Sequence, residues 1–148
     1  MNEAKERKTD SELALLAPVP LVHLLSALQV QEWVAFGSMA FEVFDKLDKQ
    51  RSDCHVDAYI YASLHDGSNV SRYWRATYIG MSEWDRELSK HRPASTANET
   101  GWGIFWKVKN LREVSESECR INEMKGFGKS TKYKKFFIPE GPILIQHP

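Results

Sequence analysis

The sequence has few cysteines, no net charge and no long hydrophobic segment. Its 148 residues contain only Cys54 and Cys119, too few for a disulfide framework, so we expect two free thiols. Lys plus Arg and Asp plus Glu each total 20, which argues against binding nucleic acid through a uniformly basic surface. The longest apolar segment, Leu13 to Val22, contains two prolines and is too short to cross a bilayer. Residues 1–12 are charged and lack a hydrophobic signal, so we expect a disordered tail and a cytoplasmic protein with no membrane partner.

Signatures of metal binding and catalysis are also missing. None of the five histidines forms a ligand motif with another histidine or with a cysteine. The segment Gly126–Thr131 resembles part of a phosphate-binding loop, but Glu123 stands where that loop requires its first glycine. Ser38 follows a glycine without the motif of a hydrolase nucleophile. We therefore expect no metal, no cofactor and no catalytic residue.

The patterning predicts a single α+β domain over residues 13–148. Apolar residues at helical spacing predict helices at 21–28 and 39–49, with Ser38 as the cap of the second, and a capped helix at 82–90 that begins after Ser82. A brief strand or loop is expected at 33–38, and aromatic and β-branched residues predict strands at 56–63, 73–81, 102–108 and 136–146. Alternating strands of this kind favour a small mixed β-barrel flanked by short helices.

A basic segment precedes the last predicted strand. Between Met124 and Pro139 the chain has five lysines, no acidic residue and several interleaved aromatic residues. Lysines neutralise phosphates and aromatic rings stack on bases, so the candidate nucleic-acid-binding residues are Lys129, Lys132, Lys134, Lys135 and Tyr133. The alternative is a solvated lysine-rich loop beside a buried strand.

Five tryptophans in 148 residues are more than an ordinary core needs. Strand alternation places Tyr59 and Tyr61 on one face, and Trp102, Ile104 and Trp106 together on another. Aromatic walls suit a planar ligand such as an unpaired base. The alternative is that most of these rings fill the core.

The chain between residues 30 and 146 resembles the PUA-like superfamily, and within it the EVE domain. The resemblance rests on the order of elements and on the segments Trp33–Ser38, Val56–Ser63, Arg75–Met81, Gly101–Leu111 and Gly141–Gln146. It implies a small barrel with a pocket for a nucleobase, often a modified one, in DNA or RNA. Carried onto this sequence, it implies ligand-binding roles for Trp33, Gly37, Ser38, Tyr61, Ser63 and Trp102.

The related ASCH domains, which include nucleic-acid-processing enzymes, share this topology and carry the motif Gly-x-Lys-x-x-Glu-x-Arg. Gly37 and Glu42 fit the motif, but Met39 and Phe44 replace its lysine and arginine. Losing both cations removes the charge stabilisation that such a hydrolase needs. The EVE pattern is altered as well, since Ala40 and Phe41 replace its polar and basic helix residues.

Three functions remain open at this point. The first is a module that binds nucleic acid or a modified nucleobase. The second is an ASCH-type nucleoside or nucleic-acid hydrolase in which Glu42 is a general acid or base, assisted by Ser38 or Ser63. The third is a protein-interaction domain that uses the aromatic face.

Overall fold

A computed structural model describes residues 9–52, 54–63, 69–127, 132–133 and 141–148 of the chain. The strands are β1 (Thr9–Asp10), β2 (Leu13–Pro20), β3 (Trp33–Ser38), β4 (Cys54–His55), β5 (Asp57–Ser63), β6 (Asn69–Ser82), β7 (Ile104–Val114) and β8 (Ile143–Gln146). The helices are α1 (Leu21–Ala27) and α2 (Phe41–Arg51), with 3₁₀ turns at Glu87–Lys90, Ala94–Thr96, Glu116–Glu118 and Ile121–Glu123.

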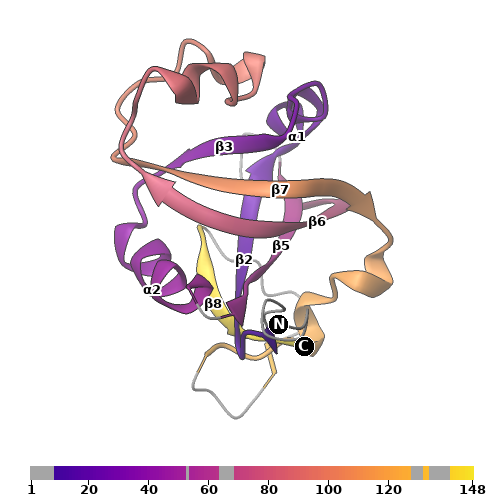
Figure 1. Ribbon diagram of the computed structural model, residues 1–148. Helices are drawn as coiled ribbons and strands as arrows, with labels where there is room; N and C mark the ends of the chain where they lie inside the picture. Colours follow the sequence, from indigo (N-terminus) through magenta and orange to yellow (C-terminus); the bar gives the residue numbers. More distant parts are fainter. Residues whose placement is uncertain (1–8, 53, 64–68, 128–131, 134–140) are drawn as a thin grey trace, which may run out of the picture.

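Six of these strands form one mixed sheet in the order β3-β7-β6-β5-β2-β8. β2 and β5 run parallel, and the other pairs are antiparallel. The strands wrap round one another with strong twist (Figure 1). This combination of a sheet and helices confirms the α+β class. β3 and β8 are the two edge strands, so closure into a barrel is not seen among the described strands.

β2 is buried on both faces of the sheet, which explains its uninterrupted apolar sequence. Leu13 and Leu15 pack in the main core, whereas Ala14 and Leu16 pack in a second cluster on the opposite face. A strand covered on both sides carries apolar residues at every position instead of at alternate ones.

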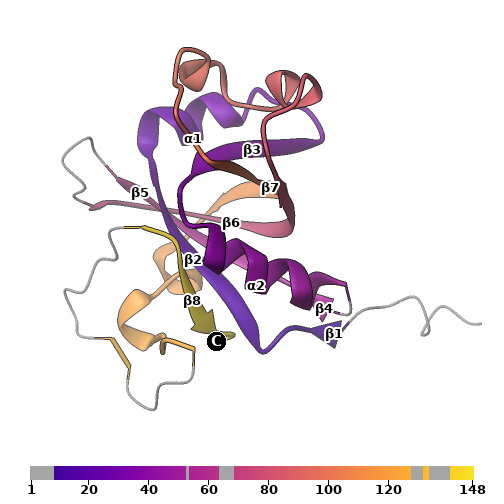
Figure 2. The same cartoon turned by 90° about the vertical axis from the view of Figure 1, so that its left-hand side faces the viewer.

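The main core lies between the sheet and the two helices. Phe44 and Leu47 of α2 are fully buried in it, and the Phe44 ring stacks on Trp106 of β7 at a centroid distance of 5.4 Å. α2 crosses the sheet on this side, while α1 packs near the Ala94–Thr96 turn at the other end (Figure 2). The helix spacing of the apolar residues therefore predicts the buried stripe correctly.

The second cluster covers the other face and contains Tyr59 and Tyr61. Both tyrosines point away from Ile60, which lies in the main core, as strand alternation predicts. Cys119 is buried beside them, and burial raises its pKa to about 12 although Arg75 opposes the shift. Cys119 and Cys54 are both free thiols.

Several predicted boundaries are wrong. α2 begins at Phe41, two residues later than predicted, and no side chain caps it; Ser38 instead accepts a hydrogen bond from the Ala40 amide at 3.0 Å. The helix predicted after Ser82 is absent, because β6 runs through Ser82 and the following turn is a short 3₁₀ helix. Its Leu88 amide is held by the Asp85 carboxylate at 2.9 Å.

Two further predicted boundaries, at the start of β7 and at the N-terminal side of the domain, also differ from the structure. β7 extends from Ile104 to Val114 instead of over 102–108, so Trp102 precedes the strand. At the N-terminal side, Thr9–Asp10 pairs with β4 and Ser11 is buried. The predicted disordered tail therefore does not extend to residues 9–12; residues 1–8 lie outside the described part. Among the described residues, the helices are all too short or too polar to cross a membrane.

Candidate functional site

A hollow of about 490 Å³ opens where the ends of β2 and β3 meet α1. We call it the Trp102 pocket. Its described lining is mostly apolar and comprises Pro18, Val19, Pro20, Phe36, Gly37, Met39, Ala40, Trp102, Trp106, Gly141 and Pro142, with the polar residues His23, Ser38, Thr96 and Glu99. Volume and composition are those of a site for a small, largely apolar molecule with a few fixed polar contacts.

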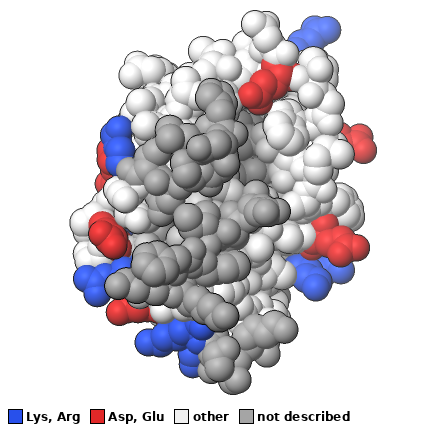
Figure 3. Space-filling view, turned by 180° about the vertical axis from the view of Figure 1, so that it is seen from behind, with Lys and Arg blue, Asp and Glu red and all other residues white. Residues whose placement is uncertain are grey.

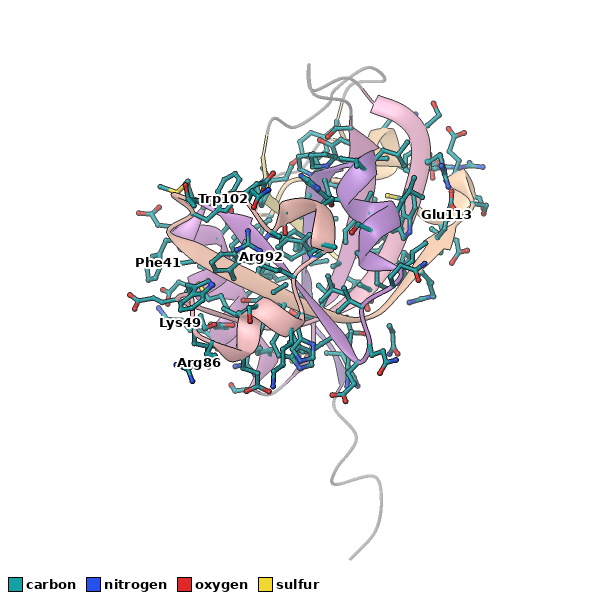
Figure 4. All side chains as sticks on the ribbon, turned by 90° about the horizontal axis from the view of Figure 1, so that it is seen from above. Phe41, Lys49, Arg86, Arg92, Trp102 and Glu113 are labelled. Carbon is teal, nitrogen blue, oxygen red and sulfur yellow. The ribbon has the colours of Figure 1, made fainter. Side chains whose placement is uncertain are left out.

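Trp102 forms one wall because Gly37 leaves room for its ring. A Cβ atom built at Gly37 would lie 2.3 Å from the Cγ and Cδ1 atoms of Trp102, far inside van der Waals contact. Trp102 is 40% exposed, so part of its surface stays accessible. Trp102 and Phe41 lie on the same side of the molecule, far from Glu113 (Figure 4). The glycine therefore determines where the ring can rest.

The carboxylate of Glu99 links two other lining residues. Its Oε1 atom accepts a hydrogen bond from Trp102 Nε1 at 3.2 Å, and its Oε2 atom lies 2.9 Å from His23 Nε2. Because a carboxylate only accepts, His23 carries its proton on Nε2. The other ring nitrogen, Nδ1, lies 2.7 Å from the Ser95 hydroxyl oxygen.

Ser95, His23 and Glu99 are hydrogen-bonded in the same series as the Ser-His-acid triad of a hydrolase. The serine of this series does not face the pocket. Ser95 does not line the hollow. Its backbone amide is bonded to the Ser26 hydroxyl at 3.2 Å, and Glu99 is shared with Trp102. The chain of hydrogen bonds therefore fixes the pocket wall and does not present a nucleophile to it.

Arg92 holds the loop that carries Glu99. Its Nε atom donates to the Thr96 hydroxyl at 3.1 Å, and its Nη2 atom donates to the backbone oxygens of Thr96 and Glu99. The guanidinium also lies over the Phe105 ring at 5.3 Å. Arg92 therefore binds Thr96 and the backbone of Glu99, and none of these hydrogen bonds uses the Glu99 carboxylate.

Three of the predicted ligand-binding residues come together in the Trp102 pocket: Gly37, Ser38 and Trp102. The other three do not line it. Tyr61 is fully buried in the second cluster, where burial and the neighbouring Cys119 raise its pKa. Ser63 is buried opposite Pro20 at the end of β5. The expectation that Tyr61 and Ser63 bind a ligand together with Trp102 is therefore not supported by their positions.

Trp33 lies elsewhere because it is at the start of β3, at the opposite end of the strand from Gly37 and Ser38. Its ring stacks on His91 at 3.7 Å with an angle of 11°, and Lys107 Nζ lies 5.1 Å from its centroid. The His91 Nδ1 atom donates to the Trp33 carbonyl at 2.9 Å. The ring is thus already engaged by side chains of the protein.

The basic segment is described only in part. Lys132 is exposed, and Tyr133 is half-buried against the second cluster, where burial raises its pKa. Lys129, Lys134 and Lys135 lie outside the described residues. On the face seen from behind, both acidic and basic side chains are visible and mostly lie toward the margin (Figure 3). No Lys or Arg is among the described residues that line the Trp102 pocket.

A smaller hollow of about 260 Å³ lies at the end of α2 and includes the cations Arg51 and Lys109 together with His55. Arg51 is paired with Asp48 at 3.1 Å.

In the part of the chain that the structure describes, no three His, Cys, Asp or Glu side chains gather as metal ligands would.

Sequence reasoning missed His23 and Glu99, the two ionisable residues of the described pocket lining. They are 76 positions apart, and neither belongs to a motif. Glu99 stands only three residues before Trp102, but this segment forms no helix or turn, so the spacing alone did not predict the contact.

Comparisons with known proteins add no family to this geometry. No family model matches the chain, and neither a curated protein nor a solved structure gives a match to it.

Proposed function

We propose that the protein binds a nucleobase, modified or plain and carried by a nucleoside or a nucleic acid, in the Trp102 pocket. The observation that carries the proposal is the open, mostly apolar hollow beside a partly exposed indole. A planar heterocycle gains about 1–3 kcal/mol from stacking on an aromatic side chain. The resemblance to the EVE domain, whose barrel holds such a base, points in the same direction.

Contact with a nucleic-acid backbone would come from outside the pocket. The described lining has no Lys or Arg and includes the acidic Glu99, so phosphate groups are disfavoured inside. Lys132 and the neighbouring lysines of the basic segment are the candidate phosphate contacts. Binding of an oligonucleotide should therefore weaken with salt, whereas binding of a nucleoside should not.

The test is calorimetric titration of the full chain with nucleosides and with short oligonucleotides, plain and modified. We expect Trp102→Ala to weaken binding about tenfold to a hundredfold, because it removes the stacking surface. Trp84→Ala is the matched control, since Trp84 is 58% exposed and lines a different hollow. Equal loss in both variants, or no binding of any nucleobase at low salt, would contradict the proposal.

The other two functions gain less from the geometry. Glu42 is exposed on the first turn of α2 and does not line the Trp102 pocket. A substrate bound in this pocket would therefore not lie against Glu42, as the hydrolase function requires. Met39 and Phe41 are 68% and 54% exposed near the pocket, which is the feature a protein-interaction role would use. Capture of a protein that is unaffected by nuclease and by Trp102→Ala would favour that role.

A further inference from the structure

We propose that the Trp102 pocket selects ligands that present N–H donors, and that Glu99 is the residue that accepts them. This inference rests on the proposed function and narrows its ligand class. The favoured ligand is a flat heterocycle with a ring N–H and an amino group side by side on one edge, as in guanine.

Most polar side chains of the lining are already committed to other partners. The Thr96 hydroxyl donates to the Pro93 carbonyl at 2.7 Å and accepts from Arg92 Nε. Both ring nitrogens of His23 are occupied, one by Ser95 and one by Glu99. His23 therefore has no free ring nitrogen for a ligand, and the Thr96 hydroxyl keeps no donor and only one neutral acceptor site.

Two further groups are restricted in the same way. Trp102 Nε1 is a donor without acceptor capacity, and it is engaged by Glu99. The Ser38 oxygen accepts from the Ala40 amide, so this hydroxyl keeps its proton as a donor. Among the described side chains of the lining, the carboxylate is therefore the strong acceptor that remains.

Glu99 has spare capacity for that task. A carboxylate offers about four acceptor sites on its two oxygens, and the hydrogen bonds to His23 and Trp102 use one site on each oxygen. The side chain is 37% exposed and lines the hollow. No Lys or Arg that would compete for it is among the described lining residues.

The chemistry of the carboxylate indicates which ligand edge fits. Two adjacent N–H groups can donate to its two oxygens in parallel, and hydrogen bonds to an ionised acceptor are about twice as strong as neutral ones. Guanine carries such an edge through its ring N–H and its amino group. Hypoxanthine lacks the amino group, and an anionic substituent at this point would be repelled.

The experiment is calorimetric titration of the full chain with guanosine and with inosine, which differ only by that amino group. In the unmodified protein we expect the affinity for guanosine to be at least about tenfold higher than the affinity for inosine. Glu99→Gln should weaken guanosine binding and remove most of this preference. Glu42→Gln, a change at an exposed acid outside the pocket, should leave both affinities unchanged.

The comparison of guanosine with inosine needs no variant, so it remains informative if Glu99→Gln unfolds the protein. Equal affinity for the two nucleosides, or a preference that survives in Glu99→Gln, would overturn the role of Glu99 while leaving nucleobase binding intact.

A second pair of probes separates this inference from the proposed function. The donor-bearing ring 2-aminobenzimidazole is compared with benzoxazole, which has no N–H. Binding of 2-aminobenzimidazole that depends on Glu99, with no nucleoside bound, would support the inference and contradict the nucleobase function. Binding of neither probe nor nucleoside would overturn both.

Discussion

Trp33 and Trp102 are held in different ways: Trp33 is stacked on a histidine, whereas Trp102 borders the open hollow of the Trp102 pocket. Trp33 is stacked on His91 at 3.7 Å and also contacts Lys107. Trp102 instead rests against Gly37 and donates through its Nε1 atom to Glu99, which leaves ring surface facing the pocket. A tryptophan whose ring is already stacked stabilises the fold, whereas one held by its edge and one side is available to a ligand.

The largest expected effect comes from closing the space that positions Trp102. In Gly37→Ala the new methyl group would lie 2.3 Å from the indole, so the ring must move and the pocket must change shape. We expect nucleoside affinity to fall at least tenfold, a change of about 1.4 kcal/mol, measured by calorimetry. Circular dichroism should show that the sheet is retained.

Gly103→Ala is the matched control for that substitution. A Cβ atom there would lie 3.6 Å from Met39 Sδ, an ordinary contact with a flexible side chain. If Gly37→Ala bound nucleosides as well as Gly103→Ala does, the position of Trp102 would be irrelevant to binding.

A smaller effect, on stability alone, is expected at the other tryptophan. His91→Ala removes the stacked ring and its hydrogen bond to the Trp33 carbonyl. Such aromatic pairs contribute about 0.5–1.5 kcal/mol, so we expect the free energy of unfolding to fall by about 1 kcal/mol in urea titrations. Nucleoside affinity should stay unchanged; a loss of affinity equal to that of Trp102→Ala would remove the distinction between the two sites.

The smallest effect is expected at Lys107. Its Nζ atom lies 5.1 Å from the centroid of the Trp33 ring, and exposed cation–π contacts contribute about 0.5–1 kcal/mol. Lys107→Ala should therefore lower the free energy of unfolding by less than 1 kcal/mol. Lys46→Ala, at an exposed position of α2, provides the comparison, and equal values in the two variants would show that the contact adds nothing.

Much of the fold follows from local sequence pattern. The alternation of Tyr59, Ile60 and Tyr61 predicts which side chain faces which core, and the spacing of Phe44 and Leu47 predicts the buried stripe of α2. Patterns of this kind work because burial on one face repeats with the period of the strand or helix. The pairing of strands depends on contacts distant in sequence, so the open order of the sheet was not predicted.

The sequence predicted a pocket residue only where that residue belongs to a locally predicted element. Gly37 and Ser38 end a strand that the sequence indicates, and they do line the pocket. Trp33 begins the same strand, four residues before Gly37, so it shares the face of Gly37 but lies farther along the strand, where it stacks on His91. His23 and Glu99 meet across 76 positions, and only the packing of α1 near the Ala94–Thr96 turn brings them together.

The most direct test of the role of Trp102 follows the indole N–H signals of the five tryptophans by nuclear magnetic resonance during a titration with guanosine. The Trp102 signal, assigned through Trp102→Phe, should move and saturate, because its Nε1 atom lies at the pocket and is bonded to Glu99. The Trp33 signal should stay in place. Movement of the Trp33 or Trp84 signal with an unchanged Trp102 signal would contradict nucleobase binding in the Trp102 pocket.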